Sequence, residues 1–147
     1  MLRKYLRPQL AAAVLNTLLL IGTPAFAATE TFTADLKGTT EVPPNESAGT
    51  GAVTATFDTA SKLFSYTVTY GGLTGPATAA HFHGPAAPGT NAPPVVPIPP
   101  TNLASPIKGE ATLTDAQAAD LEGGKWYFNV HTAAHGPGEI RGQVMKK

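Results

Sequence analysis

The chain contains no cysteine among its 147 residues. Disulfide bonds, cysteine-ligated metal sites and thiol catalysis are therefore excluded. A domain of about 120 residues is large enough to bury a stable core without such covalent links. We expect the fold to depend on that core.

Charged side chains are also scarce, at 14% of the chain, with 10 basic and 10 acidic residues. Three of the basic residues, Arg3, Lys4 and Arg7, lie in the first ten positions. Without them the chain carries 7 − 10 = −3 formal charges when histidine is neutral. A weakly acidic domain favours neither nucleic acid nor an anionic membrane surface as a partner.

Residues 1–27 have the pattern of a secretory signal peptide. The basic start is followed by the apolar run LAAAVLNTLLLIG and by AFA, the small-x-small pattern that signal peptidases cleave. The run is shorter than the roughly 20 apolar residues of a membrane-spanning helix, and Pro24 interrupts the segment. We expect cleavage after Ala27, export to the periplasm or beyond it, and one mature domain over residues 28–147.

Much of the remaining sequence alternates apolar and polar residues with period two, the pattern of half-buried β-strands. The clearest segments are 30–39, 52–58 and 62–73. Their apolar positions are Phe32, Ala34 and Leu36; Val53, Ala55 and Phe57; and Phe64, Tyr66, Val68 and Tyr70. Further strands are predicted over 78–84, 109–114, 125–133 and 138–146.

Two segments depart from this pattern. Residues 85–109 are rich in proline and predict a long ordered loop, in which PVVPI could form a buried edge segment. The segment TDAQAADLEGG predicts the one helix, with Thr114 as N-cap, Gln117 as its capping-box partner and Gly123 or Gly124 at the end. We therefore predict an all-β fold, an antiparallel Greek-key (immunoglobulin-like) β-sandwich or barrel with one short helix.

The four histidines of the chain form two pairs, and a Gly-Pro dipeptide follows each pair. His81 and His83 are two residues apart on a predicted strand, so their side chains share one face. His131 lies on another predicted strand, and His135 follows where that strand turns. Imidazole is a common ligand of copper and zinc, so these four residues are candidate ligands, for Cu(II) first and Zn(II) next.

The same residues allow a metal-free interpretation, in which the histidines are structural and connect two loops through hydrogen bonds. If a metal binds, other groups must orient the rings, and the candidates are Asn129, Thr132, Glu139 and the carbonyl groups of the Gly-Pro turns. Glu139 and Arg141 share a face of the last predicted strand and could pair, or the face could simply be solvated, where an exposed pair contributes little.

No catalytic motif is evident, because the sequence has no Gly-x-Ser-x-Gly, no glycine-rich phosphate loop and no well-spaced carboxylate pair. The composition does not indicate an oligomeric state.

Several blocks in combination resemble the CHRD domain, which is named from chordin and recurs in secreted bacterial proteins. They are EVPP, AAHFHGPA, LTDAQ and NVHTAAHGPGEIRGQ, within a similarity that extends from about Thr33 to Val144. The resemblance implies an all-β, immunoglobulin-like sandwich. Its pattern includes His81, His83, His131 and the 139–142 block, whereas asparagine is frequent at the position of His135.

A weaker similarity is to copper-zinc superoxide dismutases, which also carry a His-x-His on one strand and a later histidine. It implies copper-ligand roles for His81, His83 and His131. The chain lacks the histidine and aspartate cluster of the zinc site, and it lacks the cysteines of the disulfide.

Three hypotheses follow: an exported metal-binding β-domain, a metal-free module that binds an unidentified protein through residues 93–100, and a superoxide dismutase-like enzyme. We rank them in that order.

Overall fold

The computed structural model describes residues 27–147, and it contains eight strands and one α-helix. Of the predicted signal peptide, residues 1–26 lie outside the described part. The strands are β1 (Thr29–Lys37), β2 (Thr50–Asp58), β3 (Leu63–Gly71), β4 (Ala77–His83), β5 (Pro94–Pro97), β6 (Ile107–Thr112), β7 (Trp126–Thr132) and β8 (Ile140–Lys146). Two 3₁₀ turns, η1 (Gly38–Thr40) and η2 (Pro100–Asn102), and the helix α1 (Asp115–Glu122) complete the domain.

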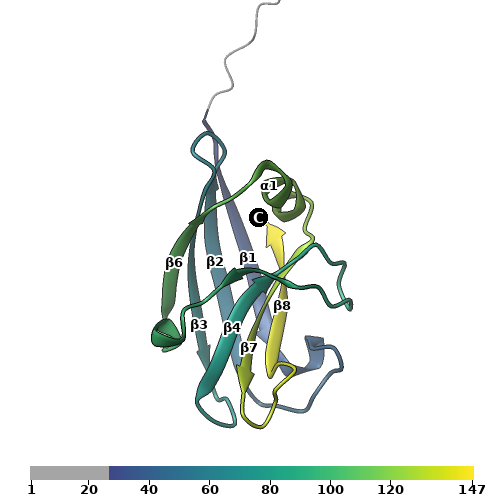
Figure 1. Ribbon diagram of the computed structural model, residues 1–147. Coiled ribbons are helices and arrows are strands. Elements are labelled where there is room, and N and C mark those ends of the chain that lie inside the picture. Colours follow the sequence, from purple (N-terminus) through teal and green to yellow (C-terminus); the bar gives the residue numbers. More distant parts are fainter. Residues whose placement is uncertain (1–26) are drawn as a thin grey trace, which may run out of the picture.

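All eight strands belong to one antiparallel sheet, in the order β5-β4-β7-β8-β1-β2-β3-β6. The sheet curls so that β4 and β7 face β2 and β3, which gives a nearly closed barrel (Figure 1). β7, β4, β5 and β6 follow one another around the barrel in Greek-key order, although β5 and β6 do not pair. The predicted all-β Greek-key class is confirmed, and the architecture is the barrel rather than two separate sheets.

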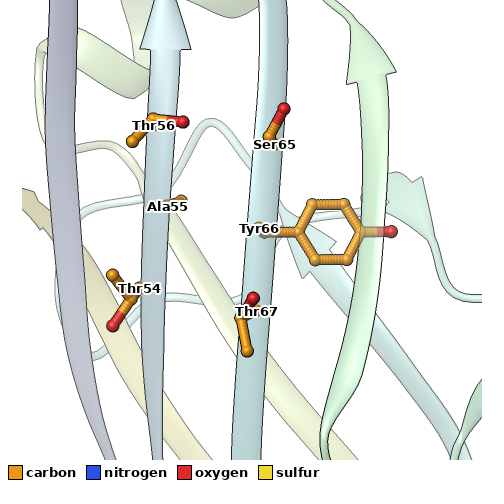
Figure 2. Close-up of a pocket in the computed structure, with 6 residues that line it drawn as sticks. All are labelled: Thr54, Ala55, Thr56, Ser65, Tyr66 and Thr67. Carbon is orange, nitrogen blue, oxygen red and sulfur yellow. The ribbon is translucent and has the colours of Figure 1, made fainter.

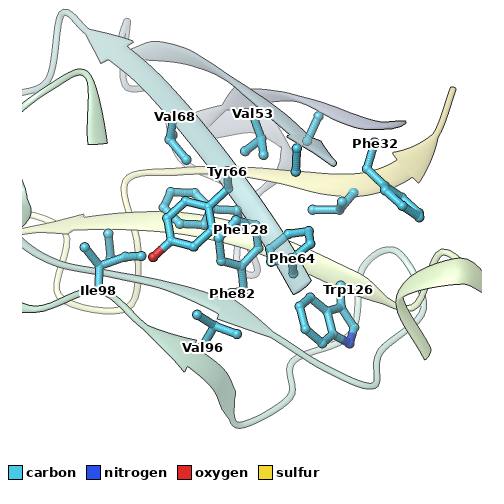
Figure 3. Close-up of a cluster of buried hydrophobic side chains, with 14 of the residues drawn as sticks. Phe32, Val53, Phe64, Tyr66, Val68, Phe82, Val96, Ile98, Trp126 and Phe128 are labelled. Carbon is cyan, nitrogen blue, oxygen red and sulfur yellow. The ribbon is translucent and has the colours of Figure 1, made fainter. Parts of the chain in front are cut away.

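The core forms where the curled sheet brings its inward side chains together. Every apolar position of the alternating pattern on β1 and β2 is buried, as are Phe64, Tyr66 and Val68 of β3. Phe82 of β4 packs edge-on against Phe64, with ring centroids 5.2 Å apart, and against Phe128 of β7 at 4.6 Å (Figure 3). Contact between β3 and β4, which are distant in the sheet order, shows that the barrel encloses one aromatic core.

The helix forms as its local sequence predicts. The Thr114 side chain accepts a hydrogen bond from the backbone of Gln117, and the Gln117 side chain accepts one from the backbone of Thr114. Within the helix, Ala118 and Leu121 are buried. Among residues 27–147, no helix has both the length and the apolar character needed to cross a membrane.

The proline-rich segment is more ordered than a loop. Residues Pro94–Pro97 form the edge strand β5, which pairs with β4, and both Val96 and Ile98 belong to the core. Proline cannot donate a ladder hydrogen bond, and this rules it out of central strands. It is tolerated in an edge strand, where the missing N–H would face solvent. The expectation of a long loop over 85–109 is therefore wrong for this part, where the alternative of a buried edge segment holds.

We expect Phe82→Ala to destabilise the protein strongly. Phe82 has no exposed surface and contacts rings from β3 and β7, so the substitution leaves a cavity that the curled sheet cannot close. The free energy of unfolding should fall by about 3–5 kcal/mol in urea titration.

Met145→Ala is the control, because Met145 is 52% exposed. It should change the free energy of unfolding by less than about 0.5 kcal/mol. Similar losses in the two variants would contradict the single aromatic core.

Candidate metal centre

Three of the four histidines meet on the outer face of the barrel. His81 and His83 alternate with the inward Phe82 on β4, and β4 pairs with β7, which carries His131. Their candidate ligand atoms all lie within 4.8 Å of one another, and Nδ1 of His81 is 3.3 Å from Nε2 of His131. Among the residues described, these three form a group that could hold one metal ion.

Two of the three rings are oriented by backbone carbonyl groups. Nδ1–H of His83 donates to the carbonyl of Ala92 at 2.8 Å, and Nδ1–H of His131 donates to the carbonyl of Gly136 at 2.8 Å. Each bond fixes the tautomer, so that in the neutral ring Nε2 carries no proton and is the nitrogen that could bind a metal. Gly136 belongs to the second Gly-Pro turn, as predicted, whereas the carbonyl of Ala92 was not among the predicted groups.

The site also favours neutral imidazole, the form that binds metals. Burial lowers the pKa of His81 to about 4, and the nearby His131 and His83 rings add to this effect. Burial likewise lowers the pKa of His83, against the opposing hydrogen bonds to Ala92 and Asn129. His81 and His83 are therefore held in the neutral form in which an imidazole nitrogen can bind a metal.

His135 does not join this group. It lies in the turn after β7, where its backbone N–H donates to the carbonyl of Thr132 at 3.2 Å. That turn keeps the 131–135 pair from converging as it would on a helix. His135 is not part of the group of three, and a ligand role for it stays a prediction.

One side of the site is covered by a stack of side chains. The Tyr127 ring lies parallel to the His83 ring, with centroids 4.6 Å apart, and the Arg141 guanidinium lies 3.4 Å from the centroid of Tyr127. Arg141 also donates to the side chain of Asn91 at 2.8 Å and to the carbonyl of Thr90 at 2.6 Å. Arg141 therefore holds the 84–93 loop that presents the Ala92 carbonyl to His83.

Sequence reasoning missed Tyr127 as a neighbour of the site. The signal was present, because Tyr127 shares a strand face with His131 through period-two alternation. Arg141 was predicted on a solvated face, yet it is 2% exposed, and so that expectation is wrong. The 84–93 loop covers the outer face of the barrel here. The alternating sequence pattern of β8 does not predict that a distant loop buries this face.

Glu139 is also buried and does not pair with Arg141. Its carboxylate accepts hydrogen bonds from Ser47 Oγ at 2.6 Å, from the backbone and hydroxyl of Thr74 at 2.7 and 2.8 Å, and from Thr132 Oγ1 at 2.5 Å. Burial alone would raise its pKa, but these donors outweigh burial and hold the pKa at about 2. Glu139 and Thr132 thus bond to each other and not to a histidine ring.

Glu41 is a second buried carboxylate on this face, and sequence reasoning did not find it. It is 4% exposed, and its Oε1 has no hydrogen-bond partner. Burial raises its pKa to about 7, although the Val42 backbone, Arg141 and Asn129 each lower it. Gly138 leaves room for it, since a Cβ there would lie 2.2 Å from Glu41 Oε1.

The pocket in Figure 2 lies elsewhere, on the outer face of β2 and β3. It has a volume of about 220 Å³ and is lined by Thr54, Ala55, Thr56, Ser65, Tyr66 and Thr67. Most of these side chains offer hydroxyl groups, and none offers a charged or imidazole group.

We expect Glu139→Gln to destabilise the protein in a pH-dependent way. The amide cannot accept every bond that the carboxylate accepts, and a loss of about 1–3 kcal/mol at pH 7 follows from the unsatisfied donors. The low folded-state pKa means that the carboxylate stabilises the fold above its ordinary value of 4.5 and loses this effect as the pH falls towards 2. Urea titrations should show the difference between wild type and variant shrinking over that range.

Glu122→Gln is the matched control, because Glu122 is exposed on α1. It should behave as wild type at every pH. A difference between wild type and Glu139→Gln that is constant from pH 7 to 2 would contradict the role of the buried carboxylate.

Comparison with known proteins bears on the identity of the chain. The family model of the CHRD domain matches residues 32–144. No curated protein and no solved structure matches the chain, so the weaker similarity to superoxide dismutases is not confirmed. Because the family model covers most of the chain, from within β1 to within β8, the protein belongs to the CHRD domain family.

Proposed function

We propose that this protein is an exported CHRD domain that binds one divalent transition-metal ion through His81, His83 and His131. Cu(II) is the first candidate for this ion, and Zn(II) is the second. Export is supported by the signal-peptide pattern of residues 1–27.

The observation that carries the proposal is the orientation of the rings. His83 and His131 both donate Nδ1–H to a backbone carbonyl, and Nε2 of His131 lies 3.3 Å from Nδ1 of His81. This is the usual arrangement of metal-binding histidines, in which an acceptor fixes the tautomer and the orientation of each ring.

The donor set favours copper or zinc. Three neutral imidazoles suit these ions, whereas calcium and magnesium prefer oxygen ligands. His81 and His131 are partly exposed, so an ion can reach the site from solvent without opening the barrel. Neither a redox nor a hydrolytic step follows from three imidazoles alone, and we propose binding without catalysis.

The test is metal content followed by titration of metal-free protein purified without a histidine tag. We expect one Cu(II) per chain with sub-micromolar affinity. His81→Ala, His83→Ala double substitution should weaken binding by more than about 100-fold, which exceeds the effect of changing an outer group alone. Calorimetry and the rise in melting temperature with added metal give two independent readouts.

His135→Ala is the matched control, since it removes an imidazole outside the group of three. It should leave stoichiometry and affinity unchanged. An equal loss in this variant would place His135 among the ligands and contradict the three-histidine site. A wild-type protein that binds neither Cu(II) nor Zn(II) would overturn the proposal and favour the metal-free interaction module.

A further inference from the structure

Asn129 lies at the centre of the histidine group. It is the cross-strand partner of His81 in the β4–β7 ladder, and it precedes His131 by two residues on the same face. Its Oδ1 is 3.0 Å from Nε2 of His83. The side chain is 3% exposed, so its amide must find partners within the protein.

The contact with His83 brings two lone pairs together. Nδ1 of His83 carries the proton that it donates to the Ala92 carbonyl, and a neutral ring therefore has no proton on Nε2. Nε2 nevertheless faces the amide oxygen, which is also an acceptor. This contact is satisfied when a cation, either a proton on Nε2 or a metal ion, is shared by the two acceptors.

The surroundings of Asn129 keep its oxygen on the histidine side. Its Nδ2 and the unpartnered Oε1 of Glu41 are close neighbours, because a Cβ on Gly138 would lie 2.9 Å and 2.2 Å from them. The nitrogen of the amide thus lies on the side of the carboxylate, without a hydrogen bond to Oε1. Turning the amide over would place its oxygen against the carboxylate oxygen and leave Nδ2 towards His83.

Gly138 makes this arrangement possible. It has a φ of +139° and adopts a conformation that residues with a side chain disfavour. Any Cβ at this position would overlap Glu41 and approach Asn129. Because Gly138 has no side chain, the buried Glu41 carboxylate can lie close to Asn129.

We propose that Asn129 supplies a fourth, oxygen ligand to the metal and that Glu41 is a positioning residue that orients the amide. This inference rests on the proposed metal site and extends its donor set from three nitrogens to three nitrogens and one oxygen. An ion at about 2.0–2.1 Å from Nε2 of His83 could lie at a similar distance from Oδ1 of Asn129, because two ligand atoms 3.0 Å apart subtend about a right angle at the ion they share.

An amide oxygen is a weak ligand for copper, comparable to the amide or carbonyl oxygens that occupy axial positions in some copper sites. It adds no charge, so the bound Cu(II) keeps its positive charge and an accessible position on the solvent side. The oxygen should therefore influence the geometry and spectrum of the site more than the total affinity.

The test compares wild type, Asn129→Ala and Asn129→Asp, each loaded with Cu(II) at pH 8, where Glu41 is largely ionised. Asn129→Ala should bind Cu(II) about tenfold more weakly and shift the parallel g value and copper hyperfine splitting in electron paramagnetic resonance. Asn129→Asp should still bind Cu(II) but should change its spectrum, because a charged carboxylate oxygen replaces the neutral amide oxygen beside the ion. Glu41→Gln should give a mixture of spectra, since the amide loses its fixed orientation.

Asn102→Ala is the matched control, because Asn102 bonds to the carbonyl of Lys108 and lies outside the histidine group. It should change neither affinity nor spectrum. Unchanged affinity and spectrum in a folded Asn129→Ala variant would overturn the fourth ligand while leaving the three-histidine site intact. If that variant does not fold, an unchanged spectrum in the nearly isosteric Asn129→Asp variant overturns it equally. Failure of wild type to bind any metal would instead overturn the site as a whole.

Discussion

The carboxylate of Glu139 is the interaction on which the arrangement of this barrel face depends. It lies at the end of the turn between β7 and β8 and accepts four hydrogen bonds from three separate segments. One of the donors is Thr132, at the other end of the same turn, so both ends are held together. The turn between them carries the Gly136 carbonyl that orients His131. A buried carboxylate with its hydrogen-bonding capacity satisfied thus connects the stability of the fold to the geometry of the site.

The two faces of the same strands have different tasks. Phe82 points into the aromatic core, while its neighbours His81 and His83 point outward, and the same alternation places Phe128 inside and Asn129 outside. The outer face of β4 and β7 is only partly solvated, because the 84–93 loop lies over part of it and is held by Arg141. Polar groups are therefore buried outside the barrel, where each needs a partner. The histidine site is the part of this layer whose nitrogen donors remain available.

Local patterns predicted what depends on neighbouring residues. Alternation located the buried positions of β1, β2 and β3, and the capping box located α1, because both signals arise within one element. The shared orientation of His81 and His83 followed in the same way. The predicted solvated pair of Glu139 and Arg141 was wrong, since burial of an outward face depends on loops that are distant in sequence. Glu41 had no local signal at all.

The sequence by itself therefore determined the all-β class, the helix and the placement of two histidines on one strand face. Only the tertiary structure decided that His131 joins them, that His135 does not, and that Asn129 lies among the three rings. The physical reason is that strand register and loop position are set by long-range pairing and by the burial of the whole core. The β4–β7 register aligns His81 with Asn129, and no pattern within either strand specifies that alignment.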